Sequence, residues 1–170
     1  MLYIETNNRM IQYAQTKSDE MGRLNNSFLQ GNGNKAGFIG ECIAWEVFGG
    51  TICNTYDYDI ILPNMVTADV KTKTVNREPK LYHEASVQEY SLHQKCDIFI
   101  FVHLLKNFKG GWVSGWIFKD RFMKESQVFK AGSMANGGGT KFRQNVRVIK
   151  INLLNSVDYL LSTYNDREIL

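Results

Sequence analysis

The most constraining feature of this sequence is a predicted hairpin that carries charged residues inside two apolar runs. The runs are YDIIL at 58–62 and VTADVK at 66–71, and a Pro-Asn turn separates them. Apolar runs on either side of such a turn predict two short paired strands. Because side chains alternate between the faces of a strand, Asp69 and Lys71 must share a face, and Asp59 can face them across the turn.

Two carboxylates and an ammonium directed at one point are costly to assemble unless something binds there. Carboxylate oxygens are the ligands that Mg²⁺ and Mn²⁺ prefer, so the arrangement favours a site for a divalent cation and a phosphodiester. Asp57 competes with Asp59 as the first acid, because residues two apart on a strand share a face. Asp59 stands directly before the apolar residues and is preferred, but the sequence leaves both open.

A helix is predicted upstream of the hairpin, over residues 35–48, where apolar residues lie on almost all sides. Glu41 falls in the buried part of this helix, so an ionised carboxylate there must be paired, protonated or bound to a metal. Glu46 lies in a similar apolar arc and is the alternative acid. Several small residues, among them Gly40, would let the helix approach a sheet closely.

This order of helix, hairpin and strand resembles the PD-(D/E)xK nuclease superfamily, which includes restriction enzymes, Holliday-junction resolvases and many phage endonucleases. The first acidic element corresponds to DII at 59–61, the second to DVK at 69–71, and the helical acid to Glu41. Glu41 is preferred over Glu46 because it follows a glycine, as in related helices. Tyr58 replaces the usual proline, and the second acid is Asp where Glu is more usual. The resemblance covers about residues 35–103.

The resemblance implies a metal-dependent endonuclease with Glu41, Asp59, Asp69 and Lys71 as catalytic residues. Mg²⁺, with Mn²⁺ as a substitute, would be held by Asp59, Asp69 and the Val70 carbonyl, and Glu41 would join directly or through water. The cation would polarise the phosphoryl oxygen and lower the pKa of a bound water, which Lys71 would position. No organic cofactor is implied.

Two glutamines, Gln88 and Gln94, follow the lysine strand at positions where similar nucleases often carry another polar contact. Basic residues are concentrated further along the chain. Residues 119–150 hold eight Lys or Arg against two Asp or Glu, whereas the formal net charge of the whole chain is +3. Such segregation suits a phosphate-facing surface, because counterion release drives nucleic-acid binding, although a solvated basic surface would show it too. The candidate DNA contacts are Lys73, Lys141, Arg143 and Arg147.

Hydrophobic periodicity predicts the remaining elements. Helices are expected over 5–21, 84–94, 119–126 and 153–164, strands near 51–54, 57–62, 66–75, 97–105, 111–118 and 146–151, and loops at 25–34 and 132–139. The order predicts an α/β protein with a restriction-endonuclease-like core, in which a central mixed β-sheet is flanked by α-helices. We expect one nuclease-like domain over residues 1–170, with its core at about 35–151.

Composition agrees with a compact domain, since 44% of residues are hydrophobic and no apolar run is long enough to span a membrane. The N-terminus lacks the pattern of a signal peptide. Cys42, Cys53 and Cys96 are odd in number and stand in apolar contexts, so we expect reduced core thiols. These observations predict a cytoplasmic protein, and a phage-encoded protein acting in the infected host cell fits the resemblance.

Three functions are consistent with the sequence. The first is a DNA endonuclease of the restriction, homing or junction-resolving type, whose substrates include branched DNA. The second is a non-catalytic nucleic-acid-binding protein on the same fold, and the third is an interaction protein whose acids and lysine form ordinary ion pairs. A chain this short that cuts two strands is expected to act as a homodimer, because each protomer carries one site.

Overall fold

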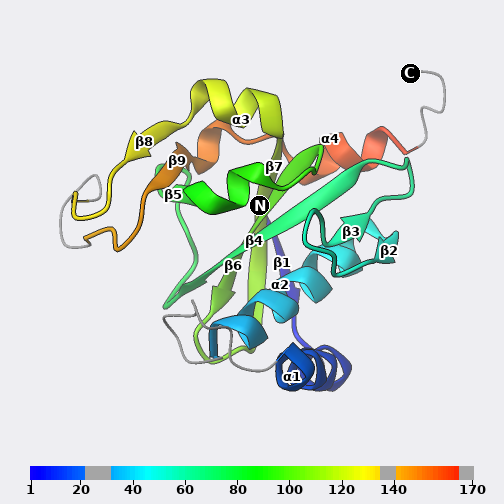
Figure 1. The fold of residues 1–170 in the computed structure, drawn as a ribbon. Coiled ribbons are helices and arrows are strands. Elements are labelled where there is room, and N and C mark those ends of the chain that lie inside the picture. Colours follow the sequence, from blue (N-terminus) through cyan, green and yellow to red (C-terminus); the bar gives the residue numbers. More distant parts are fainter. Residues whose placement is uncertain (22–31, 135–140, 165–170) are drawn as a thin grey trace.

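The computed structural model describes residues 1–21, 32–134 and 141–164 of the 170-residue chain. Within them, the larger sheet has six strands in the order β1-β7-β6-β4-β3-β2 (Figure 1). Their bounds are β1 Leu2–Glu5, β2 Thr51–Ile52, β3 Ile60–Ile61, β4 Thr67–Val75, β6 Ile98–Leu105 and β7 Gly110–Phe118. β4 and β6 are parallel and the other neighbours are antiparallel, so the prediction of a mixed sheet is confirmed.

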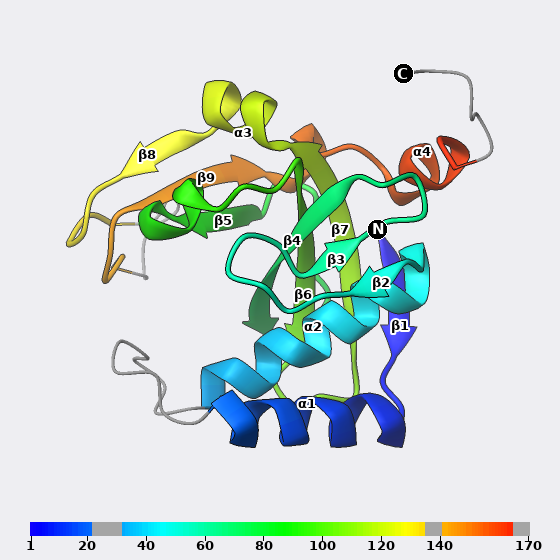
Figure 2. The same cartoon turned by 45° about the vertical axis from the view of Figure 1, so that its right-hand side comes forward.

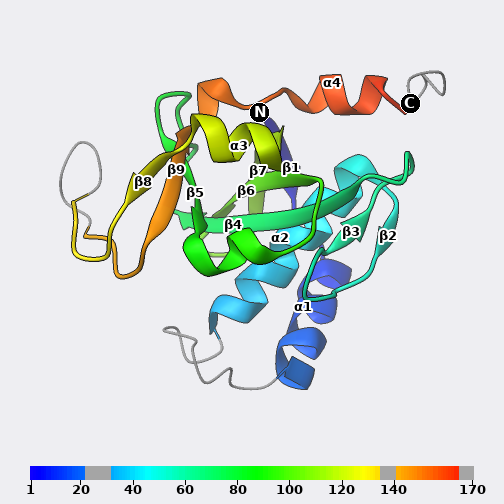
Figure 3. The same cartoon turned by 45° about the horizontal axis from the view of Figure 1, so that its top comes forward.

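A smaller antiparallel sheet has the order β5-β9-β8. It consists of β5 Glu84–Gln88, β8 Gln127–Phe129 and β9 Val146–Lys150. Figure 3 shows this small sheet on one side of β4 and the β2–β3 pair on the other. β4 therefore lies between the small sheet and the β2–β3 pair.

Helices cover both faces of the larger sheet. α2 (Asn32–Phe48) packs on β4 and β6, and α1 (Asn8–Met21) packs on α2 from outside (Figure 2). The shorter elements are α3 (Lys119–Glu125), α4 (Val157–Ser162) and the 3-10 helices η1 (Glu89–His93) and η2 (Ile151–Leu153). Among the described helices, none combines the length and the apolar character that a bilayer span requires.

The larger sheet separates two hydrophobic cores. On the α2 side, the even-numbered residues of β6 from Ile98 to Leu104 pack against Ile39 and its neighbours. On the opposite side, Phe99 and Phe101 pack against Phe122 of α3 and against the small sheet. β6 is thus buried on both faces, which explains why its sequence is an almost uninterrupted apolar run.

Two predicted helices are wrong in type or length. The stretch 84–94 is β5 followed by η1, because Ala85 and Val87 alternate into the core with the period of a strand. The C-terminal stretch 153–164 contains only α4, which begins after η2 and is capped by Ser156.

Other differences concern boundaries. The helix predicted from residue 5 begins at Asn8, because β1 takes residues 2–5 into the sheet beside β7, and β8 is a further strand that was not predicted. Cys42 and Cys96 are buried free thiols as expected, but Cys53 is only half-buried. The two predicted loops, 25–34 and 132–139, lie mostly outside the described residues. The end of the first prediction is wrong, because α2 already begins at Asn32.

α2 approaches β4 most closely at Gly40. A Cβ atom added there would overlap the hydroxyl of Thr72, whereas one added at Gly37, three residues earlier, would meet no atom within 4 Å. Thr72 is β-branched and stiff at χ1, so it cannot easily move aside. The glycine therefore permits the contact that brings the next residue, Glu41, against β4.

We predict that Gly40→Ala lowers the free energy of unfolding by about 1–3 kcal/mol, the usual cost of overpacking, despite its better helix propensity. The matched control is Gly37→Ala on the same helix, which should raise the free energy of unfolding by about 0.5–1 kcal/mol. Urea denaturation of both variants measures the difference. Equal effects of the two substitutions would contradict the close contact.

Candidate active site

β3 begins only at Ile60 and leaves the edge of β4 beyond Ala68 without a β3 partner. The two strands pair only through Thr67 and Ala68 of β4. Further along this edge, the Val70 N–H donates to Asp59 Oδ2 at 2.7 Å in place of a carbonyl of β3. The N–H and C=O of a strand residue point to the same side, so the Val70 carbonyl lies on the open edge too. A carboxylate and a carbonyl are thus available beside the end of β3.

Asp69 and Lys71 share one face of β4, as their spacing predicts. Lys71 Nζ lies 2.6 Å from Asp69 Oδ2 and donates to Gln94 Oε1 at 2.9 Å. Asp69 is only 2% exposed, and Lys71 is half-buried. The two residues pair in register with Phe99 and Phe101 of β6, so an apolar surface lies beneath the ion pair. Low solvent exposure strengthens the attraction between its charges.

Glu41 reaches the same place from α2. It is 8% exposed, its Oε2 accepts no hydrogen bond from the described residues, and it interacts electrostatically with both Asp59 and Asp69. Glu46, the alternative helical acid, is exposed. Glu41 is therefore the acid of α2 that belongs to this site.

Burial and neighbouring negative charges raise the pKa values of Glu41 and Asp59. Burial, together with the charges of Asp59 and Asp69, raises the pKa of Glu41 from 4.5 to about 9. Burial and Asp69 raise the pKa of Asp59 from 3.8 to about 7, although the Val70 N–H and the Lys71 ammonium favour its charged form. At neutral pH the Glu41 carboxyl therefore retains its proton unless further positive charge arrives.

The available donors suit a hard cation, since they are carboxylate and carbonyl oxygens. One of them, Glu41 Oε2, is buried and has no hydrogen-bond partner among the described residues. Within the described ranges, no three His, Cys, Asp or Glu side chains are spaced to bind one ion together as they stand. Asp59 and Asp69 are close enough to hydrogen-bond each other. These two and the Val70 carbonyl are therefore the candidate direct ligands, with Glu41 acting through a bound water.

The segment before β3 closes one side of the site. Gln94 Nε2 donates to the Tyr56 carbonyl at 2.8 Å, so Gln94 connects Lys71 to this segment. Asp57 Oδ1 accepts from the N–H of Lys95 at 3.1 Å. Of the two aspartates that the sequence leaves open, Asp57 thus holds the segment in place, and Asp59 is the one beside β4.

Gln94 is one of the two glutamines that the sequence offers as polar contacts, whereas Lys119 is a residue near the site that the sequence does not assign to it. Gln94 contacts Lys71, whereas Gln88, the other candidate, is exposed at the start of η1. Lys119 Nζ donates to the Gln94 carbonyl, which brings a second ammonium near the site. In the sequence Lys119 is only one member of a basic segment, and no local pattern connects it to residue 94.

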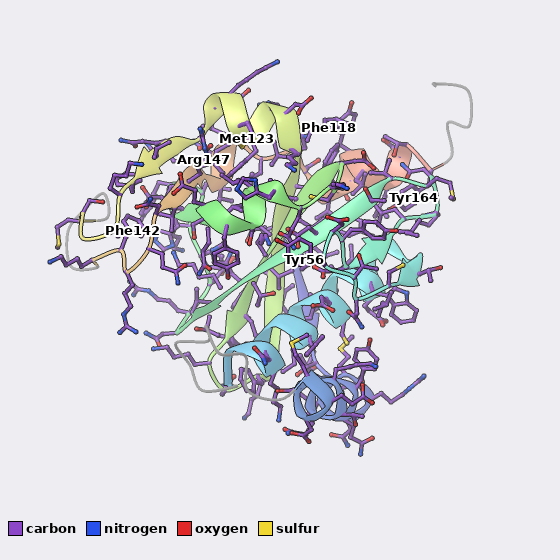
Figure 4. All side chains as sticks on the ribbon, viewed as in Figure 1. Tyr56, Phe118, Met123, Phe142, Arg147 and Tyr164 are labelled. Atoms are coloured by element: carbon purple, nitrogen blue, oxygen red, sulfur yellow. The ribbon has the colours of Figure 1, made fainter. Side chains whose placement is uncertain are left out.

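The candidate DNA contacts lie apart from the carboxyl groups. Lys73 follows Lys71 on β4, and its Nζ donates to the Glu84 carbonyl at 3.3 Å. Lys141 and Arg143 are exposed near the start of β9. Arg147 Nη1 donates to the Met123 carbonyl at 2.9 Å, so this arginine holds the end of α3 (Figure 4). DNA contact by these four residues stays a prediction.

Comparison with known proteins gives no matching family model and no match among curated proteins. The resemblance to the nuclease superfamily therefore rests on the motif and on the placement of its residues. Glu41, Asp59, Asp69 and Lys71 come from α2, the residue before β3, and β4, and these elements bring them together at one edge.

We predict that the metal-free protein loses stability as the pH rises from about 5 to about 9. Above their unfolded-state pKa values, Glu41 and Asp59 release protons on unfolding that the folded protein still holds, so each group can reduce the free energy of unfolding by up to about 1.4 kcal/mol per pH unit until its folded-state pKa is passed. Urea denaturation in EDTA at pH 5, 7 and 9 measures this dependence.

Glu41→Gln is the matched variant, because it keeps the shape and removes the titration. Its stability should change less than that of the wild type between pH 7 and pH 9, the range between the raised pKa values of Asp59 and Glu41, where Glu41 still holds its proton after most of Asp59 has ionised. Parallel pH profiles for the two proteins would contradict the burial of an unpaired Glu41 carboxyl.

Proposed function

We propose that this chain is a divalent-metal-dependent DNA endonuclease of the PD-(D/E)xK type, built on a restriction-endonuclease-like core. The observation that carries the proposal is the ion pair of Lys71 and Asp69, placed beside two further carboxyls whose pKa values burial and mutual repulsion raise. Strongly perturbed titratable groups gather at functional sites more often than elsewhere. These carboxyls also lie beside the part of β4 that β3 does not cover.

Asp59, Asp69 and the Val70 carbonyl would hold Mg²⁺, with Mn²⁺ as a substitute. A cation bound there would polarise a phosphoryl oxygen and lower the pKa of a water molecule. Divalent charge would also favour the ionised form of Glu41, whose free Oε2 can then accept a hydrogen bond from that water. Without the cation, burial and the neighbouring negative charges keep Glu41 and part of Asp59 protonated at neutral pH.

Lys71 has the geometry of a group that positions substrate. Asp69 Oδ2 and Gln94 Oε1 hold its Nζ from two directions, and an ammonium has a third N–H to donate. That N–H would bond a non-bridging phosphate oxygen or the attacking water and offset the charge that develops in the transition state. Gln94 would keep the ammonium directed at that position.

DNA is the proposed partner. The basic residues of the small sheet and of β4 would contact phosphates away from the cutting site. A homodimer is proposed for cutting both strands, since each protomer carries one site.

A non-catalytic nucleic-acid-binding protein is the second candidate function. One observation favours it. Among the described residues, no three His, Cys, Asp or Glu side chains are placed so that they could bind one metal ion together. Such a protein would bind DNA and leave every phosphodiester intact with or without metal.

We predict that the wild type cleaves a supercoiled plasmid or a four-way DNA junction in Mg²⁺ and not in EDTA. Lys71→Ala and Asp69→Asn should each reduce the cleavage rate by about 10²–10³-fold, the usual effect of removing one group that stabilises a transition state. Gel assays of both substrates give the rates, and the preferred substrate separates junction resolution from ordinary cutting.

Lys17→Ala is the matched control, because Lys17 is a surface lysine of α1 whose only described ion pair is with Glu20, three residues along the same helix. It should cleave at the wild-type rate, since a surface ion pair contributes little. DNA binding with no cleavage in Mg²⁺ or Mn²⁺ would replace the nuclease by the non-catalytic binding protein. Cleavage that persists in Lys71→Ala would contradict the assigned site.

A further inference from the structure

A tightly fixed loop presents one aromatic ring to solvent beside the candidate active site. Residues 55–58 form this loop, in which Thr55 N and Thr55 Oγ1 both donate to the Tyr58 carbonyl, at 3.1 and 2.7 Å. The Tyr58 N–H returns a hydrogen bond to Thr55 Oγ1 at 3.0 Å. The backbone that carries Tyr56 is thus closed on itself by three hydrogen bonds.

The loop is also tied to the rest of the molecule. The Tyr56 carbonyl accepts from Gln94 Nε2 at 2.8 Å, and Asp57 Oδ1 accepts from the Lys95 N–H at 3.1 Å. The ring of Tyr58 packs against the core formed with the small sheet. Since ties of this kind limit local opening, the loop is a rigid support for the residue at its tip.

The side chain of Tyr56 does not share in this packing. It is 75% exposed, although its own backbone is fixed. Figure 4 places Tyr56 near the centre of the view, between η1 and α2, whereas Arg147 and Phe142 lie toward the small sheet. One residue, Gln94, hydrogen-bonds both the Tyr56 carbonyl and Lys71 Nζ, so a single side chain separates the backbone that carries the ring from the group assigned to the phosphate.

An exposed, rigidly supported aromatic ring offers a flat face to a ligand at a small entropic cost. Next to a phosphate-binding lysine, the matching ligand group is a nucleobase of the same strand. Bases inside a duplex are stacked on their neighbours and present only their edges, whereas an unpaired base has a free face. Stacking on Tyr56 therefore selects DNA in which the nucleotide beside the scissile phosphate is unpaired.

We propose that Tyr56 stacks on an unpaired base adjacent to the scissile phosphate, so that the substrate is DNA with a junction between paired and unpaired strands. This inference rests on the proposed endonuclease function and names its substrate class. The phosphate is bound at Lys71, and the base that follows it is held on the tyrosine ring. Fully paired linear DNA lacks this second contact.

The test compares the binding of two DNAs in EDTA, where no cleavage occurs. One is a linear duplex, and the other is the same duplex with one end splayed into two single strands, carrying 2-aminopurine at the first unpaired position. The wild type should bind the splayed DNA about 5- to 150-fold more tightly, the range expected for stacking of one base. The 2-aminopurine fluorescence should fall on binding, because stacking quenches it.

Three variants separate stacking from other effects. Tyr56→Ala should lose the preference and the quenching, while Tyr56→Phe, which keeps the ring, should retain both. Tyr82→Ala is the matched control, because Tyr82 is also exposed, at 70%, but lies in the segment between β4 and β5. It should behave like the wild type. Thermal unfolding of each variant should be unchanged, since neither tyrosine ring is buried.

Two results would overturn the inference, and they differ in what they say of the enzyme. Equal binding of the two DNAs by the wild type, or full preference and quenching in Tyr56→Ala, would remove the stacking role and leave the proposed endonuclease intact. No binding of either DNA by any of the proteins would overturn the endonuclease proposal together with this one.

Discussion

The burial of three carboxyl groups along the open edge of β4 is the constraint on which the rest of the site depends. In water these groups would be ionised and hydrated. In the protein their neighbours are the Val70 N–H, the Lys71 ammonium and the other carboxyl groups. That is too little positive charge, and the raised pKa values of Glu41 and Asp59 follow from the deficit. A cluster of this kind holds protons at neutral pH, and the proposed binding of a cation would change its charge.

Features distant in the sequence serve this arrangement. Gly40 lets α2 lie against Thr72, and only this close approach puts Glu41 within electrostatic range of the strand. The short β3 does not reach Val70, so the Val70 N–H donates to Asp59 Oδ2 instead of to a carbonyl of β3. Gln94 then joins Lys71 to the segment before β3. The site therefore combines Glu41 from α2, two aspartates and Lys71 from the hairpin, and Gln94 from the chain after η1.

Much of this could be predicted from local patterns. The alternation of strand residues predicts that Asp69 and Lys71 share a face, and their ion pair follows directly. The long apolar run of β6 and the apolar helix that carries Glu41 predict buried elements, and both are buried. The choice of Glu41 over Glu46 agrees with the structure as well, because only Glu41 is turned toward the sheet.

Other parts depend on contacts between distant segments, which one sequence does not record. The sequence offers Gln88 and Gln94 as polar contacts without separating them, and Gln94 is the one that contacts Lys71 because the chain after η1 lies beside residue 56. β1 and β8 are short edge strands whose pairing partners decide their conformation. The stretch 84–88 contains Ala85 and Val87 at strand spacing, but its glutamate, alanine and glutamine favour a helix, and pairing with β9 decides for the strand.

The central claim is that the carboxyl cluster is a cation site held partly protonated until the cation binds. Calorimetric titration with Mn²⁺, performed at pH 7 in two buffers of different ionisation enthalpy, measures both binding and the protons released. The account predicts binding with net proton release in the wild type and its loss in Asp69→Asn, because the cation displaces protons from Glu41 and Asp59. Absence of Mn²⁺ binding, or equal binding by the Asp69→Asn variant, would contradict it.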